Sequence, residues 1–114
     1  MKSFDELDVF KKEFKRLFKK HNTLNDDFEK FKKVLAMYPT GVGKNFIIIH
    51  SSPKIKIVKA HMACRALRNN HLLRVMYAYF EQEQKIEFIE LYFKGDKENE
   101  NRERIKEYLK NHQN

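Results

Sequence analysis

The spacing of the apolar residues changes near Pro39, and this change restricts the folds that the chain can adopt. Before Pro39, residues 7–21 and 23–38 place apolar side chains three and four positions apart, which predicts two amphipathic helices. The two stripes consist of Leu7, Phe10, Phe14, Leu17 and Phe18, and of Phe28, Phe31, Leu35 and Tyr38. Because the connection around residues 21–22 is brief, we expect an antiparallel helical hairpin that ends at the proline.

After the turn-rich stretch TGVGKN, the pattern becomes typical of strands. The β-branched and alternating segments are NFIIIH, KIKIVKA, LLRVMYAYF and KIEFIELYFK, and the last two are joined by the polar turn EQEQ. Such short runs separated by polar turns favour an antiparallel sheet. Residues 2–7 fit either a short strand or an early helical turn. Residues 95–114 turn at Gly95 and predict a polar helix that docks lightly or lies exposed.

These elements predict an α+β fold in one domain, residues 1–114. We expect the N-terminal helical hairpin to pack on one face of a three- or four-stranded antiparallel sheet, with a C-terminal helix after the last strand. A chain of 114 residues suffices for a single modest core. The other sheet face is expected to stay free, and Arg74 should point to it because its alternate neighbours face the core.

Positive charge is concentrated in the middle of the chain, whose formal net charge is +8. No acidic residue lies between Glu29 and Glu81, whereas the stretch from Glu81 to the end has nine acidic and seven basic residues, a net charge of −2. The basic residues of the acid-free stretch are Lys30, Lys32, Lys33, Lys44, Lys54, Lys56, Lys59, Arg65, Arg68 and Arg74. This segregation indicates a polyanionic or acidic partner. The alternative is a basic surface without a partner.

Several other classes of protein fit the sequence poorly. The single cysteine, Cys64, excludes an internal disulfide framework, and the cytoplasm is the simplest compartment. The charged first twenty residues do not resemble a signal peptide, and no apolar run is long enough to span a membrane. His61 and Cys64 form an isolated H-x-x-C without a second ligand pair, so we predict no metal and no cofactor.

Three stretches resemble the RelE/ParE toxin superfamily of bacterial toxin–antitoxin systems. FKKEFKRLFKKH followed by LNDDFEKFKKVL resembles its helical hairpin, and VKAHMACRALRNNHLLRVMYAY resembles its central basic strand, loop and Arg-Val-x-Tyr strand. KIEFIELYFKGDKENENRERIKEYL resembles the last strand and final helix of a RelE-like branch. The resemblance covers nearly the whole chain and implies the toxin of a type II toxin–antitoxin system.

The resemblance implies a metal-independent endoribonuclease that cleaves mRNA on the ribosome, together with a cognate antitoxin that neutralises it. Arg74 matches the phosphate-binding arginine of such toxins, His61 is a candidate acid or base, and Lys94 falls where relatives carry a basic residue after the last strand. The residues implied to bind RNA are Lys54, Lys56, Lys59, Arg65, Arg68, His71 and Lys97.

The sequence departs from that pattern after the last strand. Many ribonuclease members have a catalytic Tyr or His there, whereas this chain has the acid-rich KGDKENENRER. Tyr92 is a further candidate, and Tyr108 has no certain equivalent. The ParE branch inhibits DNA gyrase without cutting RNA, so a gyrase inhibitor remains an alternative. A degenerate RNA-binding module that has lost its acid–base residue is another.

Overall fold

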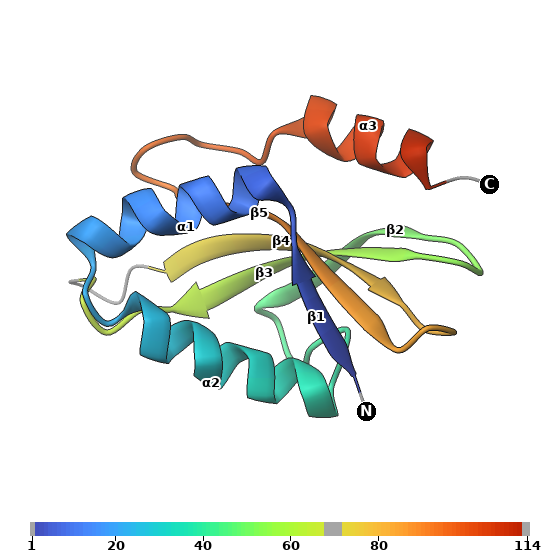
Figure 1. Ribbon diagram of the computed structural model, residues 1–114, viewed down its shortest axis with the longest axis horizontal. Helices are drawn as coiled ribbons and strands as arrows, with labels where there is room; N and C mark the ends of the chain where they lie inside the picture. Colours follow the sequence, from blue (N-terminus) through green and yellow to red (C-terminus); the bar gives the residue numbers. More distant parts are fainter. Residues whose placement is uncertain (1, 68–71, 113–114) are drawn as a thin grey trace.

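A computed structural model describes residues 2–67 and 72–112, with the backbone alone described at Leu72. The described residues form three helices and five strands (Figure 1). In chain order these are β1 (Ser3–Glu6), α1 (Asp8–Lys20), α2 (Leu24–Met37), β2 (Phe46–Ser51), β3 (Lys56–Ala63), β4 (Leu72–Phe80), β5 (Lys85–Phe93) and α3 (Arg102–Asn111). The strands form one sheet in the order β1-β5-β4-β3-β2.

The α+β class is confirmed, but two details of the expected architecture are wrong. The chain begins with a strand rather than with the helical hairpin, and the sheet is mixed and five-stranded rather than antiparallel with three or four strands. The additional strand, β1, pairs in parallel with β5, while the other neighbours are antiparallel. β1 has four residues, too few for an alternating pattern to distinguish a strand from a helical turn.

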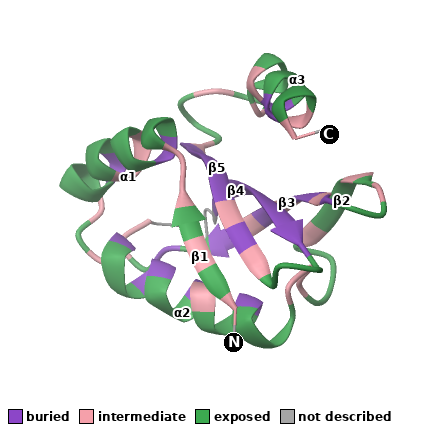
Figure 2. Cartoon of the chain, turned by 45° about the vertical axis from the view of Figure 1, so that its right-hand side comes forward, coloured by how far each residue is buried: buried purple, intermediate pink, exposed green. Residues whose placement is uncertain are grey.

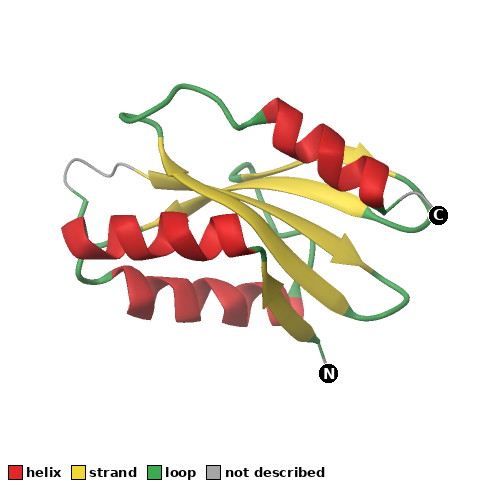
Figure 3. Cartoon of the chain, turned by 45° about the horizontal axis from the view of Figure 1, so that its top comes forward, coloured by secondary structure: helices red, strands yellow, loops and turns green. Residues whose placement is uncertain are grey.

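The larger core lies between the sheet and the helices α1 and α2, which run side by side on one face (Figure 3). Its centre is aromatic: the ring of Phe88 lies 5.4 Å from that of Phe10 and 4.8 Å from that of Phe28, measured between centroids. Offset and edge-on ring pairs of this kind add to the free energy gained by burial. The helix stripes predicted from the sequence therefore mostly face the sheet, with Phe10, Leu17, Phe28, Phe31 and Leu35 buried. Phe18 and Tyr38, which belong to the same predicted stripes, are exposed.

α3 covers part of the opposite face of the sheet. Ile105 and Tyr108 of α3 are buried on a second apolar cluster formed by Ile55, Ile57, Met76, Ala78, Phe80 and Ile89. Figure 2 shows the resulting band of buried residues across the central strands. The prediction of a free sheet face is therefore wrong where α3 lies. The final helix docks lightly, as one of the two alternatives from the sequence predicted, because only Ile105 and Tyr108 of α3 are buried.

Polar contacts also hold α3 in place. The Tyr108 hydroxyl donates a hydrogen bond to Glu87 on β5 at 2.6 Å, and the Arg104 guanidinium bonds Glu13 of α1 at 3.0 Å. Glu13 also accepts from the backbone N–H of Leu91, at a point of β5 beyond the paired length of β1. One carboxylate thus joins α1, β5 and α3. Within the described residues, no helix is both long enough and apolar enough to cross a membrane.

Truncation of Ile105 tests the docking of α3. Ile105→Ala should lower the free energy of unfolding by about 2 kcal/mol, because it removes buried methyl groups and leaves a cavity against the sheet. Chemical denaturation measures this loss. Lys106→Ala, on the exposed side of the same helix, is the matched control and should change stability by less than about 0.5 kcal/mol. Equal effects of the two substitutions would show that α3 does not depend on this contact.

Candidate functional site

The sheet face beyond α3 carries a group of positive side chains, which we call the basic cluster: Lys59, His61, Arg74 and Lys94. His61 on β3 is paired in register with Arg74 on β4, and Arg74 is paired with Tyr92 on β5. Lys59 lies two residues before His61, and Lys94 two residues after Tyr92. Alternate residues of a strand point to the same face, so β3 and β4 bring Lys59, His61 and Arg74 together. Lys94 follows the end of β5 in a turn, close enough for its charge to act on His61. All three residues predicted to be catalytic, Arg74, His61 and Lys94, belong to this cluster.

His61 is set apart from an ordinary surface histidine by its surroundings. Partial burial, followed by the charges of Arg74, Lys59 and Lys94, lowers the pKa of His61 below its usual value of 6.5. The imidazole is therefore neutral near pH 7 and can accept a proton. Three cations can bind an anion, and a neutral base beside them can remove a proton from a group next to that anion.

Acidic residues from β5 and from the segment after it partly neutralise the cluster. The Lys59 ammonium bonds a carboxylate oxygen of Glu100 at 2.9 Å. Glu90, a fully buried carboxylate, pairs with Lys97 and accepts a hydrogen bond from the backbone N–H of Asn101 at 2.8 Å. Burial opposes charge on both partners of the first pair, but their contact outweighs it, raising the pKa of Lys59 and lowering that of Glu100. Neither pairing is predicted by the sequence.

Tyr92 lies in the same group and has an unusual hydroxyl. The oxygen is buried, and within the described part of the chain it has no partner that satisfies hydrogen-bond geometry. Burial raises the pKa of Tyr92, against the opposing effect of the Lys59 charge. The Lys97 ammonium lies 5.1 Å from the centroid of the Tyr92 ring, a cation–π distance. The nearby Lys59 ammonium interacts with this hydroxyl as a charge and, outside strict hydrogen-bond geometry, as a hydrogen-bond donor, so Tyr92 is associated with the Lys59–Glu100 pair.

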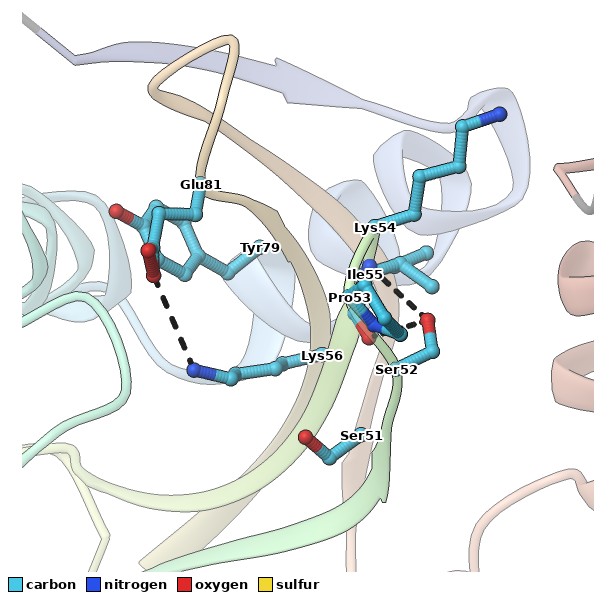
Figure 4. Close-up of a pocket in the computed structure, with 8 residues that line it drawn as sticks. All are labelled: Ser51, Ser52, Pro53, Lys54, Ile55, Lys56, Tyr79 and Glu81. Carbon is cyan, nitrogen blue, oxygen red and sulfur yellow. Dashed lines mark hydrogen bonds and ion pairs between the residues drawn. The ribbon is translucent and has the colours of Figure 1, made fainter.

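The residues predicted to bind RNA do not form one surface. Lys59 and Lys97 lie at the basic cluster, whereas Lys54 and Lys56 lie at the opposite end of β3, around the turn that joins it to β2. There they line a hollow of about 450 Å³ together with Tyr79 and Glu81, and Lys56 is 3.9 Å from the Glu81 carboxylate (Figure 4). Arg68 and His71 lie outside the described residues.

Arg65 has a different environment from the one predicted. Its guanidinium and its backbone N–H both bond the Asp27 carboxylate at 2.9 Å, and Asp27 is buried at the start of α2. Burial alone would raise the pKa of Asp27, but the hydrogen bonds from Arg65 and from Thr23 outweigh it and lower the pKa. Thr23 also accepts from the backbone N–H of Ala66 at 2.9 Å. Arg65 therefore fastens the chain after β3 to α2.

The structure also describes the surroundings of the possible metal ligands. Cys64 is buried, with its sulfur 3.6 Å from the Thr23 hydroxyl. In residues 2–67 and 72–112, no three His, Cys, Asp or Glu side chains converge as a metal site requires. His61 and Cys64 thus belong to different surroundings, the first to the basic cluster and the second to the core between the sheet and the helices.

Titration of His61 tests the electrostatic description of the cluster. By proton NMR, the midpoint of the His61 ring resonances should lie below 6.5 and should move upward in Arg74→Gln, because that variant removes one of the neighbouring charges. Lys85→Gln removes an equal charge at the other end of the sheet, where Lys85 pairs with Phe80, and should leave the midpoint unchanged. An equal shift in both variants would indicate that net charge, rather than the neighbouring Arg74, controls the titration.

The chain was compared with known proteins by sequence and by structure, and only the structural comparison gave a match. No sequence-family profile matches the chain, and no curated protein matches it. A chain of the crystal structure of the archaeal RelE–RelB complex from Pyrococcus horikoshii OT3 superposes with a TM-score of 0.62 at 19% sequence identity. The match covers 82% of this chain and 96% of that chain. The chain described here therefore has a RelE-like fold, as its sequence blocks predicted.

Proposed function

We propose that the protein is the toxin of a type II toxin–antitoxin system and a metal-independent endoribonuclease that cleaves mRNA on the ribosome. The observation that carries this proposal is the convergence of a neutral histidine with three cations on one sheet face. A RelE-like fold alone would be compatible with many activities. The basic cluster adds the groups that a phosphodiester cleavage needs, namely a proton acceptor and positive charges beside it.

The proposed reaction is attack of a ribose 2′-hydroxyl on the adjacent phosphate. His61 accepts the proton of the attacking hydroxyl, while Arg74 and Lys59 bind the non-bridging oxygens and stabilise the negative charge that develops on phosphorus. The bond to the 5′-oxygen of the next nucleotide breaks, and we assign Lys94 as the donor of a proton to that oxygen. The products are a 2′,3′-cyclic phosphate and a 5′-hydroxyl end, so all atoms and charges balance.

Binding to a ribosome would involve basic residues outside the cluster. Lys54 and Lys56 at the far end of β3, and Lys97 beside the cluster, are proposed to contact the phosphate backbone of rRNA or mRNA. Because they occupy two ends of the sheet, a large nucleic acid or ribonucleoprotein fits them better than a short oligonucleotide does. For Arg65, Arg68 and His71 an RNA contact stays a prediction from the sequence, and Arg65 is already bonded to Asp27.

The proposed protein partner is an acidic antitoxin. Its support is the acid-free stretch between Glu29 and Glu81, together with the exposed isoleucines Ile47, Ile48 and Ile49 on β2. β2 lies at one edge of the sheet, and no described strand pairs with the backbone on its outer side. Consecutive exposed isoleucines on an edge strand favour a partner protein that covers them.

Cleavage can be tested by inducing the protein in a bacterial host and mapping mRNA ends across the transcriptome within minutes. We expect new ends inside translated frames, and Arg74→Ala should reduce them by about 100-fold or more, because it removes charge stabilisation of the transition state. His61→Gln should also reduce them strongly. Lys33→Ala removes a positive charge from the exposed side of α2, which packs on the other sheet face, and should cleave normally.

The result separates the proposal from its alternatives. Growth arrest without new mRNA ends would contradict cleavage and favour a non-enzymatic toxin such as a gyrase inhibitor. Binding to ribosomes without arrest or new ends would favour a degenerate RNA-binding module. Equal cleavage by the Arg74→Ala variant and the wild-type protein, at equal expression levels, would exclude the basic cluster as the active site.

A further inference from the structure

The segment that follows β5 passes along the basic cluster and brings an acid onto it. We call residues 94–101, with the sequence KGDKENEN, the acidic strap. It starts with a turn in which the backbone N–H of Asp96 bonds the carbonyl of Phe93 at 2.9 Å. Near its end, Glu100 accepts a hydrogen bond from the Lys59 ammonium at 2.9 Å. A residue of the proposed phosphate site is therefore already paired with an anion of the same chain.

The acidic strap is held in place by Glu90, whereas Glu100 is the acid that contacts the basic cluster. The buried Glu90 carboxylate pairs with Lys97 in the middle of the strap and accepts from the backbone N–H of Asn101 at its end. Asn101 in turn begins α3, since its side chain accepts from the backbone N–H of Arg104 at 3.0 Å. The backbone on both sides of Glu100 is thus fixed independently of Lys59, and the Glu100 side chain can leave Lys59 by rotating about its own bonds.

A second cation stands close to the carboxylate of Glu100. The guanidinium nitrogen Nε of Arg102 lies 4.0 Å from the oxygen of Glu100 that Lys59 does not bond. The Arg102 side chain is 77% exposed, whereas that of Glu100 is only 13% exposed. A carboxylate displaced from Lys59 would therefore move toward water and a neighbouring guanidinium, which avoids leaving a buried charge without a partner.

We propose that Glu100 is an intramolecular phosphate mimic that occupies the Lys59 anion site in the free protein and must be displaced by the RNA backbone. A carboxylate and a phosphodiester each offer two oxygens that share one negative charge, so both suit the same ammonium group. This inference rests on the proposed function and specifies how the site is regulated. It also specifies the ligand class. An RNA strand with several phosphates can displace Glu100 from Lys59 while its other phosphates bind Arg74 and Lys94. A single small anion would have to displace Glu100 without these additional contacts.

The displacement is tested with RNA that binds but is not cleaved. A fluorescently labelled 2′-O-methyl RNA of about twelve nucleotides lacks the attacking hydroxyl, and its dissociation constant is measured by anisotropy. Glu100→Gln should bind about three- to tenfold more tightly than the wild-type protein, because the competing ion pair is weakened. Glu98→Gln is the matched control: it removes the same charge from an exposed position of the strap and should change the affinity by less than about twofold.

A double-variant cycle shows whether the gain passes through Lys59. In the Lys59→Gln background, Glu100→Gln should no longer increase the affinity, because its partner is absent. Glu100→Asp provides a second variant that keeps the charge but shortens the side chain, and it should bind more tightly than Glu98→Gln. Circular dichroism and thermal unfolding confirm that each variant is folded.

Failure of this inference is distinguishable from failure of the proposed function. If the wild-type protein binds the RNA in a Lys59-dependent manner but Glu100→Gln and Glu98→Gln have equal affinities, the mimic is excluded and the RNA-binding function stands. A gain for Glu100→Gln that persists without Lys59 also excludes the mimic. If no folded variant binds the RNA, the mimic is contradicted, whereas the proposed function is decided separately by the mapping of mRNA ends.

Discussion

The central strand β4 is buried on both of its faces, and this constraint limits where charged side chains can lie beside it. One face packs against α1 and α2 through Leu73, Val75 and Tyr77, and the other packs against α3 through Met76, Ala78 and Phe80. Arg74 lies near the start of the strand, beyond the part of the sheet that α3 covers. Charge is expensive to bury without a partner, so the residues of the basic cluster lie where the second layer ends. A sheet open along the whole of one face would not restrict them in this way.

The same constraint explains why acids from the C-terminal part of the chain approach the cluster. α3 reaches its place on the sheet through the acidic strap, which must cross the end of β5. Glu90 is buried at that crossing and is balanced by Lys97 and by the backbone of Asn101. Removing one partner of a buried charge costs more than removing an exposed pair. The contact that anchors the strap is therefore a structural one, while the Glu100 carboxylate, which is not fully buried as that of Glu90 is, can exchange with another anion at Lys59.

The pKa of His61 depends on which charged side chains lie next to its imidazole. Burial first, and then the neighbouring positive charges, lower the pKa of His61, whereas the acids contact Lys59 and Lys97 rather than the histidine itself. A carboxylate beside His61 would have the opposite effect and would favour the charged imidazolium. The acidic strap therefore lowers the net charge of the site without converting its neutral histidine into an acid.

By itself the sequence determined the α+β class, most of the two apolar helix stripes and four of the strands, because alternation along a strand and spacing along a helix are local properties. The grouping of Arg74, His61 and Lys94 came from the resemblance to RelE-like toxins, not from these local patterns. Its resemblance to RelE-like proteins also agrees with the observed fold. The tertiary structure decided the rest: β1 as a parallel neighbour of β5, α3 as a second layer, Arg65 as a partner of Asp27, and Glu100 as a partner of Lys59. Residues 41 positions apart make that last contact. No local pattern encodes such a pairing, because it depends on where the packing of α3 directs the chain after β5.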